Sequence, residues 1–99
     1  MNSIIYEKAK RLDGSLKKTI MALWEDMRKN IFTDNDSLSE FRDKNFDGLG
    51  DYHFGLGLYL RNNILSSDSE LYLKFIESGI NRRDDMSSLI ISLWHISLQ

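Results

Sequence analysis

Hydrophobic positions repeat at helical spacing over most of the chain. Between residues 16 and 31 the apolar side chains fall at steps of three and four residues, and charged side chains take the opposite face. The apolar face consists of Leu16, Ile20, Leu23, Trp24, Met27 and Ile31. The spacing predicts one long amphipathic helix, with Ser15 as its N-cap.

Start and stop signals predict further helices. Segments 37–40 and 67–70 both read Ser-x-x-Glu, the pattern of a capping box. The second precedes an apolar series that reaches Gly79, and glycine can close a helix in the left-handed conformation. Asp84 or Asp85 can cap a last helix, which carries its apolar side chains on one face. These side chains are Met86, Leu89, Ile90, Leu93 and Trp94.

Residues 51–65 leave two interpretations open. Apolar side chains at 54, 56, 58 and 60 alternate with Gly55, Gly57 and Tyr59, which is a strand pattern. The run is also apolar on all sides, which favours a mostly buried central helix whose two glycines permit close helix packing. We predict the helix and keep the strand as the alternative.

Composition supports a helical chain. The 99 residues include no proline and no cysteine. Proline is least tolerated inside helices, so its absence favours them, and the absence of cysteine excludes disulfides and thiolate metal sites. A chain of this length supports one domain. We therefore predict an all-α protein, a compact bundle of about five helices in a single domain over residues 1–99.

Overall charge and hydropathy restrict the partners. The net charge of −2 gives no reason to expect nucleic-acid binding. No stretch approaches the ~18 apolar residues of a membrane span, and the first residues do not resemble a signal peptide. We expect a cytoplasmic protein, either a monomer or a weak dimer because a core of this size is thin.

The charge is unevenly distributed along the chain. Residues 1–33 carry seven basic against four acidic side chains, a net +3, whereas residues 34–51 carry six acidic against two basic, a net −4. Aromatic rings, including that of Phe32, are interleaved with this acidic segment and can serve as apolar anchors. Complementary charge speeds association and selects partners, so we predict a surface for a basic protein. Its predicted members are Asp34, Asp36, Glu40, Phe41, Asp43, Phe46, Asp47 and Asp51.

The acidic segment also contains part of a calcium-loop pattern. Residues 43–48 match its opening, D-x-[DN]-x-[DN]-G, and Asp51 takes the ninth position. The twelfth position, which should be a bidentate glutamate, is Phe54. We therefore expect an acidic loop and no metal, with a calcium-responsive domain as a minor alternative.

A second polar group follows this loop. His53 and Arg61 are eight residues apart, about two helical turns. Together with Asn62, Asn63, Asp84 and Asp85 they can form a site for an anion or a nucleotide. In the alternative interpretation His53 ties the loop to the helix and Arg61 pairs with an acid. No nucleophile with an obvious base is apparent, so we expect neither enzymatic activity nor a cofactor. His95 is interpreted as a residue at the boundary of the core.

Two blocks of sequence resemble a small family of bacterial domains of unknown function. The first is H-F-G-L-G-x-x-x-R-N-N, at residues 53–63, and the second is D-D-M-S, at residues 84–87, before an aliphatic helix. The resemblance covers roughly residues 50–95, with Arg82-Arg83 where the family usually has a proline. The chain is also similar to the small stand-alone immunity proteins of polymorphic toxin systems. This resemblance implies an immunity protein that neutralises a cognate toxin. A nucleotide- or small-ligand-binding module is the alternative.

Overall fold

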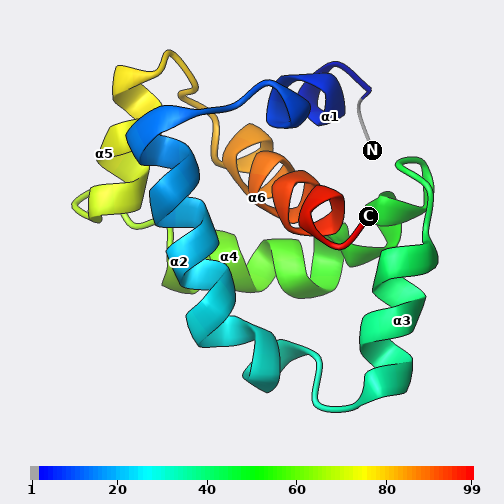
Figure 1. Ribbon diagram of the computed structural model, residues 1–99. Helices are drawn as coiled ribbons and strands as arrows, with labels where there is room; N and C mark the ends of the chain where they lie inside the picture. Colours follow the sequence, from blue (N-terminus) through cyan, green and yellow to red (C-terminus); the bar gives the residue numbers. More distant parts are fainter. Residues whose placement is uncertain (1–2) are drawn as a thin grey trace.

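The last helix, α6 (Arg83–Ser97), forms the centre of the molecule in the computed structural model, which describes residues 3–99. Nine of its side chains from Met86 to His95 are buried, because other helices surround it (Figure 1). The sequence predicts that this helix buries one apolar face, but the buried part of α6 is wider than that face. His95 was expected at the boundary of the core, but it is only 2% exposed.

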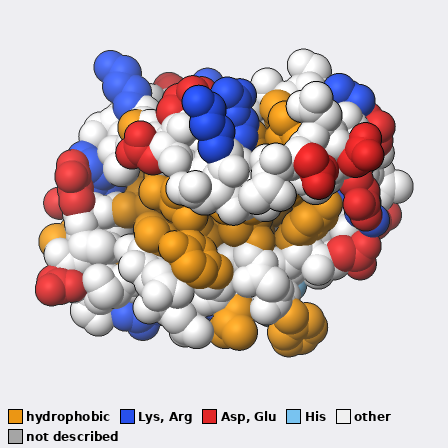
Figure 2. Space-filling model, turned by 90° about the horizontal axis from the view of Figure 1, so that it is seen from below, with side chains coloured by type: hydrophobic (Ala, Val, Ile, Leu, Met, Phe, Trp, Pro, Cys, Tyr) orange, Lys and Arg blue, Asp and Glu red, His pale blue; other side chains and the backbone are white. Residues whose placement is uncertain are grey.

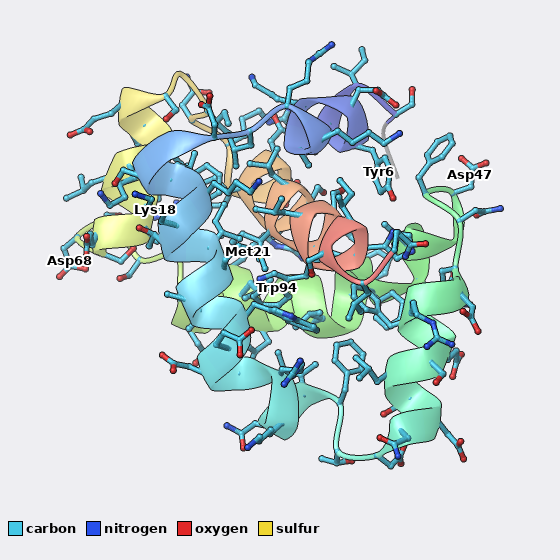
Figure 3. The ribbon with its side chains drawn as sticks, in the orientation of Figure 1. Tyr6, Lys18, Met21, Asp47, Asp68 and Trp94 are labelled. Atoms are coloured by element: carbon cyan, nitrogen blue, oxygen red, sulfur yellow. The ribbon has the colours of Figure 1, made fainter. Side chains whose placement is uncertain are left out.

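Five α-helices are arranged around α6: α1 (Ser3–Lys10), α2 (Gly14–Ile31), α3 (Asn35–Asp43), α4 (Leu58–Asn63) and α5 (Glu70–Glu77). Helices α1, α2 and α4 pack against α6, and α5 packs against α2. Two tryptophans join α2 to α6, since the rings of Trp24 and Trp94 are 5.0 Å apart. Figure 3 shows Trp94 in the interior, whereas Asp47 and Asp68 lie at opposite edges of the molecule.

The all-α prediction is confirmed, with no strand within residues 3–99. The stretch 48–63 is helical throughout but changes geometry twice. A 3-10 helix, η1 (Gly48–Tyr52), leads into a π-helix, η2 (His53–Gly57), and then into α4. The strand alternative is wrong, and so is the expectation of a mostly buried central helix. Phe54 is 81% exposed and Leu58 is 45% exposed.

The helix starts lie close to their predicted positions, but different residues cap them. Asp13, not Ser15, precedes α2. At α3 the Asp34 carboxylate accepts a hydrogen bond from the Ser37 amide, so Ser37 lies inside the helix instead of capping it. The N-cap of α5 is Ser69, two residues after the predicted Ser67.

The predicted end of α5 agrees with the structure, whereas the predicted N-cap of α6 does not. Gly79 follows α5 with a φ of +85°, as predicted for a left-handed closing residue. Arg82 precedes α6, and Asp84 and Asp85 lie in its first turn, where acidic side chains interact favourably with the helix dipole. Among residues 3–99, none of the helices combines the length and hydropathy that crossing a bilayer requires.

Candidate functional site

An open groove of about 710 Å³ lies between the end of α2, helix α3 and the stretch 48–63. Figure 2, seen from below, shows an apolar hollow across this face, with acidic side chains gathered on the side where α3 lies. The lining residues are Met27, Asn30, Ile31, Phe32, Ser37, Glu40, Lys44, Asp51, Tyr52, Gly55, Leu56 and Tyr59. Three separate parts of the chain therefore build one concave surface.

Beneath the groove lies a cluster of aromatic side chains. Phe32 and Phe41 stack with their ring centroids 4.9 Å apart, and Tyr52 meets Phe41 edge-on at 5.0 Å. Trp24 contacts both phenylalanines from below. Such packed rings hold the groove floor in a fixed shape. Phe41 is fully buried, which contradicts its predicted role as an anchor for a partner, whereas Phe32 is only 9% exposed but lines the groove.

The charged side chains in the groove wall are Glu40, Lys44 and Asp51. The Lys44 ammonium donates to the Asp51 carboxylate over 3.0 Å, and this hydrogen bond raises the pKa of Lys44. Within the described residues, Glu40 forms no ion pair. The pKa of the Tyr52 phenol is raised, chiefly by burial and next by the negative charge of Glu40. The groove therefore carries one carboxylate whose charge is not already paired.

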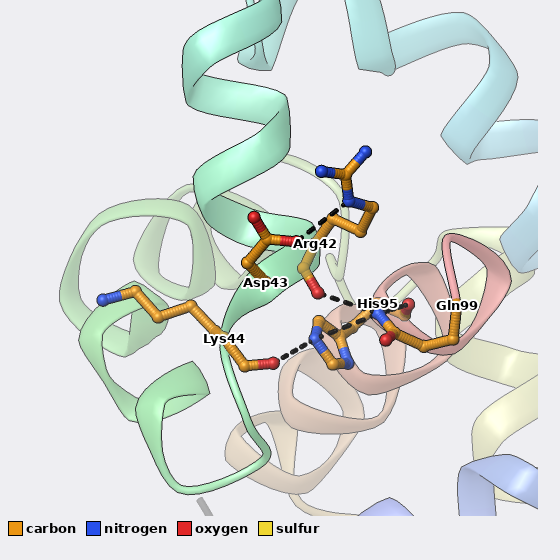
Figure 4. A network of polar contacts seen from close by, with 5 residues as sticks. All are labelled: Arg42, Asp43, Lys44, His95 and Gln99. Atoms are coloured by element: carbon orange, nitrogen blue, oxygen red, sulfur yellow. Dashed lines mark hydrogen bonds and ion pairs between the residues drawn. The ribbon is translucent and has the colours of Figure 1, made fainter.

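Acidic side chains continue along α3 beside the groove. Asp36, Glu40 and Asp43 are spaced by four and three residues, so they share one side of the helix. Asp43 pairs with Arg42 at 3.0 Å. The C-terminus of the chain holds this end of α3 in place, because Gln99 donates to the Arg42 carbonyl over 2.9 Å (Figure 4). His95 also bonds the Lys44 carbonyl, at 2.6 Å.

Residues 54–59, in the segment that forms the opposite wall, include three exposed large side chains. Phe54, Leu58 and Tyr59 are 81%, 45% and 48% exposed, and all three belong to η2 or α4. Tyr59 lines the groove, whereas Phe54 and Leu58 lie about one helical turn apart and outside its lining. An exposed aromatic side chain at a concave surface is typical of binding sites.

The predicted partner surface is divided by the fold. Asp34, Asp36 and Glu40 are exposed on or beside α3, and Glu40 and Asp51 reach the groove. Asp47 is exposed and does not line the groove; it lies in the loop near Tyr6 (Figure 3). Phe46 is half-buried with its ring 5.9 Å from that of Tyr6, so it packs against α1. The eight residues thus do not form one continuous surface.

The calcium-like loop does not gather its oxygen atoms around one point. Asp43 and Asp51 pair with cations, as described above, and the Asn45 side chain accepts the Gly48 amide at 2.8 Å. Across residues 3–99, no group of three or more His, Asp or Glu side chains is placed to hold a metal ion.

Arg61 is a structural link between η2 and α6. Its guanidinium donates to Ser87 Oγ over 3.0 Å and to the His53 carbonyl over 3.2 Å, and it lies 3.4 Å from the Asp84 carboxylate. The Arg61 side chain is only 12% exposed. These contacts agree with the interpretation in which Arg61 pairs with an acid.

The other residues of the predicted ligand site are dispersed. His53 contributes its carbonyl to Arg61, while its ring stacks edge-on with Phe54 at 4.9 Å. Asn62 is exposed, and Asn63 donates to the Tyr59 carbonyl within its own helix. Asp85 is half-buried. The structure brings Arg61, Asp84 and the His53 carbonyl together, but around a packed side chain instead of an open site.

Sequence reasoning missed the groove and its exposed rim. Residues 54–60 offer only apolar side chains and glycine, a pattern typical of a buried helix, so it gave no indication that Phe54 and Leu58 are exposed. The other wall cannot be inferred from local pattern, because it comes from residues 27–44.

Five α-helices around a buried C-terminal helix, with an acidic-edged apolar groove on one face, define a small all-helical domain with a surface suited to binding. The sequence model of a family described as "Domain of unknown function (DUF6794)" matches residues 16–98, so the chain belongs to this family. Comparisons with curated proteins and with solved structures give no match.

Proposed function

We propose that this protein is a non-enzymatic inhibitor, an immunity protein that binds a basic bacterial toxin in the cytoplasm and blocks its active site. The toxin is proposed to be a nuclease, and the inhibitor to act as a monomer or weak dimer. The observation that carries the proposal is the groove, in which a rigid apolar floor, the carboxylate of Glu40 and the half-exposed ring of Tyr59 line one concave surface.

The chemistry of this face suits a protein partner. Protein interfaces combine an apolar centre, where a few large side chains supply most of the binding energy, with a polar rim. Tyr59 supplies exposed apolar area in the lining, and α3 supplies carboxylates along the edge. Carboxylates attract a cationic enzyme and accelerate its association, which an inhibitor of a toxin requires.

Co-expression with the toxin encoded beside this gene tests the proposal. Cells should survive with the wild-type chain, and the two proteins should elute together in gel filtration. Tyr59→Ser should reduce protection at least tenfold, because it removes apolar contact area from the lining of the groove. Leu73→Ser is the matched control, since Leu73 is 48% exposed on α5, outside the groove.

Two outcomes would contradict the proposal. In the first, the toxin kills cells that contain the folded wild-type chain and no complex survives gel filtration. In the second, Tyr59→Ser protects as well as Leu73→Ser, which would leave inhibition intact but place its surface elsewhere than the groove.

A further inference from the structure

We infer that the groove receives a basic side chain, an arginine or lysine of the partner, whose aliphatic stem lies between the apolar walls and whose cation reaches Glu40. This inference rests on the proposed function only in that the occupant is a protein segment. It names the anchor residue by its chemistry.

The walls match the stem of such a side chain. Met27 and Ile31 on α2 face Leu56 on η2 across the groove, and the tyrosine rings of Tyr52 and Tyr59 complete the lining. Arginine and lysine cover apolar surface with their methylene groups while the charged end seeks a polar partner. Tyrosine faces also attract cations, so the lining favours both parts of the side chain.

The charges favour a cation over an anion. Lys44 is bound to Asp51 at 3.0 Å, and its charge also interacts with Glu40, which forms no ion pair among residues 3–99. Two carboxylates against one ammonium leave the lining with a net charge of −1. Asp36 lies one turn before Glu40 on the same side of α3 and adds negative potential. An acidic segment in the groove would be repelled, and a wholly apolar one would cover Glu40 without compensating its charge.

A selection from a displayed library of random 12-residue peptides, made against the purified full chain, tests this inference without knowledge of the partner. Enriched peptides should share one arginine or lysine flanked by apolar residues. Titrated into the isotope-labelled chain, they should shift the amide resonances of Gly55, Leu56 and Tyr59. Replacing the basic residue by citrulline, which keeps the shape of arginine without its charge, should weaken binding at least tenfold.

The chain offers a matched pair of variants for the same peptides. Glu40→Gln should weaken the arginine peptide about tenfold and remove its advantage over the citrulline peptide. Asp36→Asn should change binding less than threefold, because Asp36 is not in the lining. Both side chains are exposed, so both variants should fold, and circular dichroism verifies this.

Several results would overturn the inference: peptides enriched without a basic residue, no enrichment at all, citrulline peptides that bind equally tightly, or resonance shifts outside the groove. A concentration-dependent dimer in sedimentation, abolished by Tyr59→Ser, would assign the groove to a second copy of the chain. Failure of toxin protection alongside basic peptides in the groove would overturn only the proposed function. Toxin inhibition that is insensitive to Glu40→Gln would overturn only the basic anchor.

Discussion

Arg61 illustrates how one side chain can join elements that lie far apart in the sequence. Because its guanidinium bonds both the His53 carbonyl and Ser87, Arg61→Ala should leave those groups without their partner and lower the free energy of unfolding by about 2–3 kcal/mol. Asp84→Asn should change it by less than about 1 kcal/mol, since the Asp84 side chain is 56% exposed and exposed ion pairs contribute little. Urea denaturation measures both values, and equal losses would contradict this role for Arg61.

At the start of α3, the Asp34 cap predicts a specific dependence on pH. The hydrogen bond from the Ser37 amide lowers the pKa of Asp34 below its usual value near 3.8. A carboxyl whose pKa is lowered by folding stabilises the folded state above its unfolded pKa, and this contribution is lost as the pH falls through the folded pKa.

Asp34→Asn keeps a capping side chain that does not titrate, so it is the natural comparison. The wild-type chain should exceed it in Tm by a constant amount from about pH 7 to about pH 5, and the difference should shrink below about pH 4. Thermal unfolding followed by circular dichroism measures this. A difference that stays constant down to pH 3 would contradict the role of the charged cap.

Among the elements, the π-helix η2 contains two glycines in opposite environments. A Cβ added at Gly55 would meet no atom within 4 Å, whereas one at Gly57 would lie 2.9 Å from Arg61 Nη1. Gly55→Ala should therefore raise the free energy of unfolding, by up to about 1 kcal/mol, because alanine favours helix. The free energy of unfolding of Gly57→Ala should be about 1–2 kcal/mol below that of Gly55→Ala, because the Arg61 guanidinium would lose its bond to Ser87.

The cause of this difference can be isolated in a double variant. In an Arg61→Ala background the obstruction is gone, so Gly57→Ala should become about as favourable as Gly55→Ala. Urea denaturation of the four chains gives the coupling. If Gly57→Ala and Gly55→Ala had equal effects with Arg61 present, close packing at Gly57 would not be the reason for a glycine there.

Element type followed from the sequence more readily than element position in the core. The periodicity of residues 16–31 predicted α2, and the signals near residues 37, 67 and 84 placed three more helices to within a few residues. Burial was assigned to the wrong helix, since Phe54 faces solvent whereas the serines of α6, Ser87 and Ser92, are buried. Apolar content alone does not show which helix the others surround, because that depends on contacts distant in sequence.

The groove is a property of the whole molecule, which is why sequence inspection identified only some of its charges. Glu40 and Asp51 were recognised as acidic residues, but their place beside Tyr52 and Tyr59 depends on how α2, α3 and residues 48–63 meet. Arg61 was assigned to a ligand site because polar residues near one another in sequence look alike whether they bind a ligand or join helices. Its 12% exposure and three partners distinguish the two roles.

Helix α1 lies outside the residues matched by the family, yet it is joined to the core through a buried polar chain. The Tyr6 hydroxyl is 2.8 Å from His95 Nδ1, and His95 Nε2 is 2.6 Å from the Lys44 carbonyl. Because a carbonyl can only accept, Nε2 carries the proton in this bond, and Nδ1 of a neutral imidazole then accepts from Tyr6. One histidine thus connects α1, α6 and the loop that follows α3.

Tyr6→Phe should leave Nδ1 buried without a donor and lower the free energy of unfolding by about 1–3 kcal/mol. In a His95→Leu background, where no nitrogen remains to be satisfied, the same change should have an effect near zero, and the difference between the two backgrounds measures the coupling. Tyr72→Phe on α5 is the control, since it tests the loss of a hydroxyl from a half-buried ring elsewhere. If Tyr6→Phe were as mild as Tyr72→Phe, packing of α1 alone, without the bond to His95, would hold the N-terminal helix on the core.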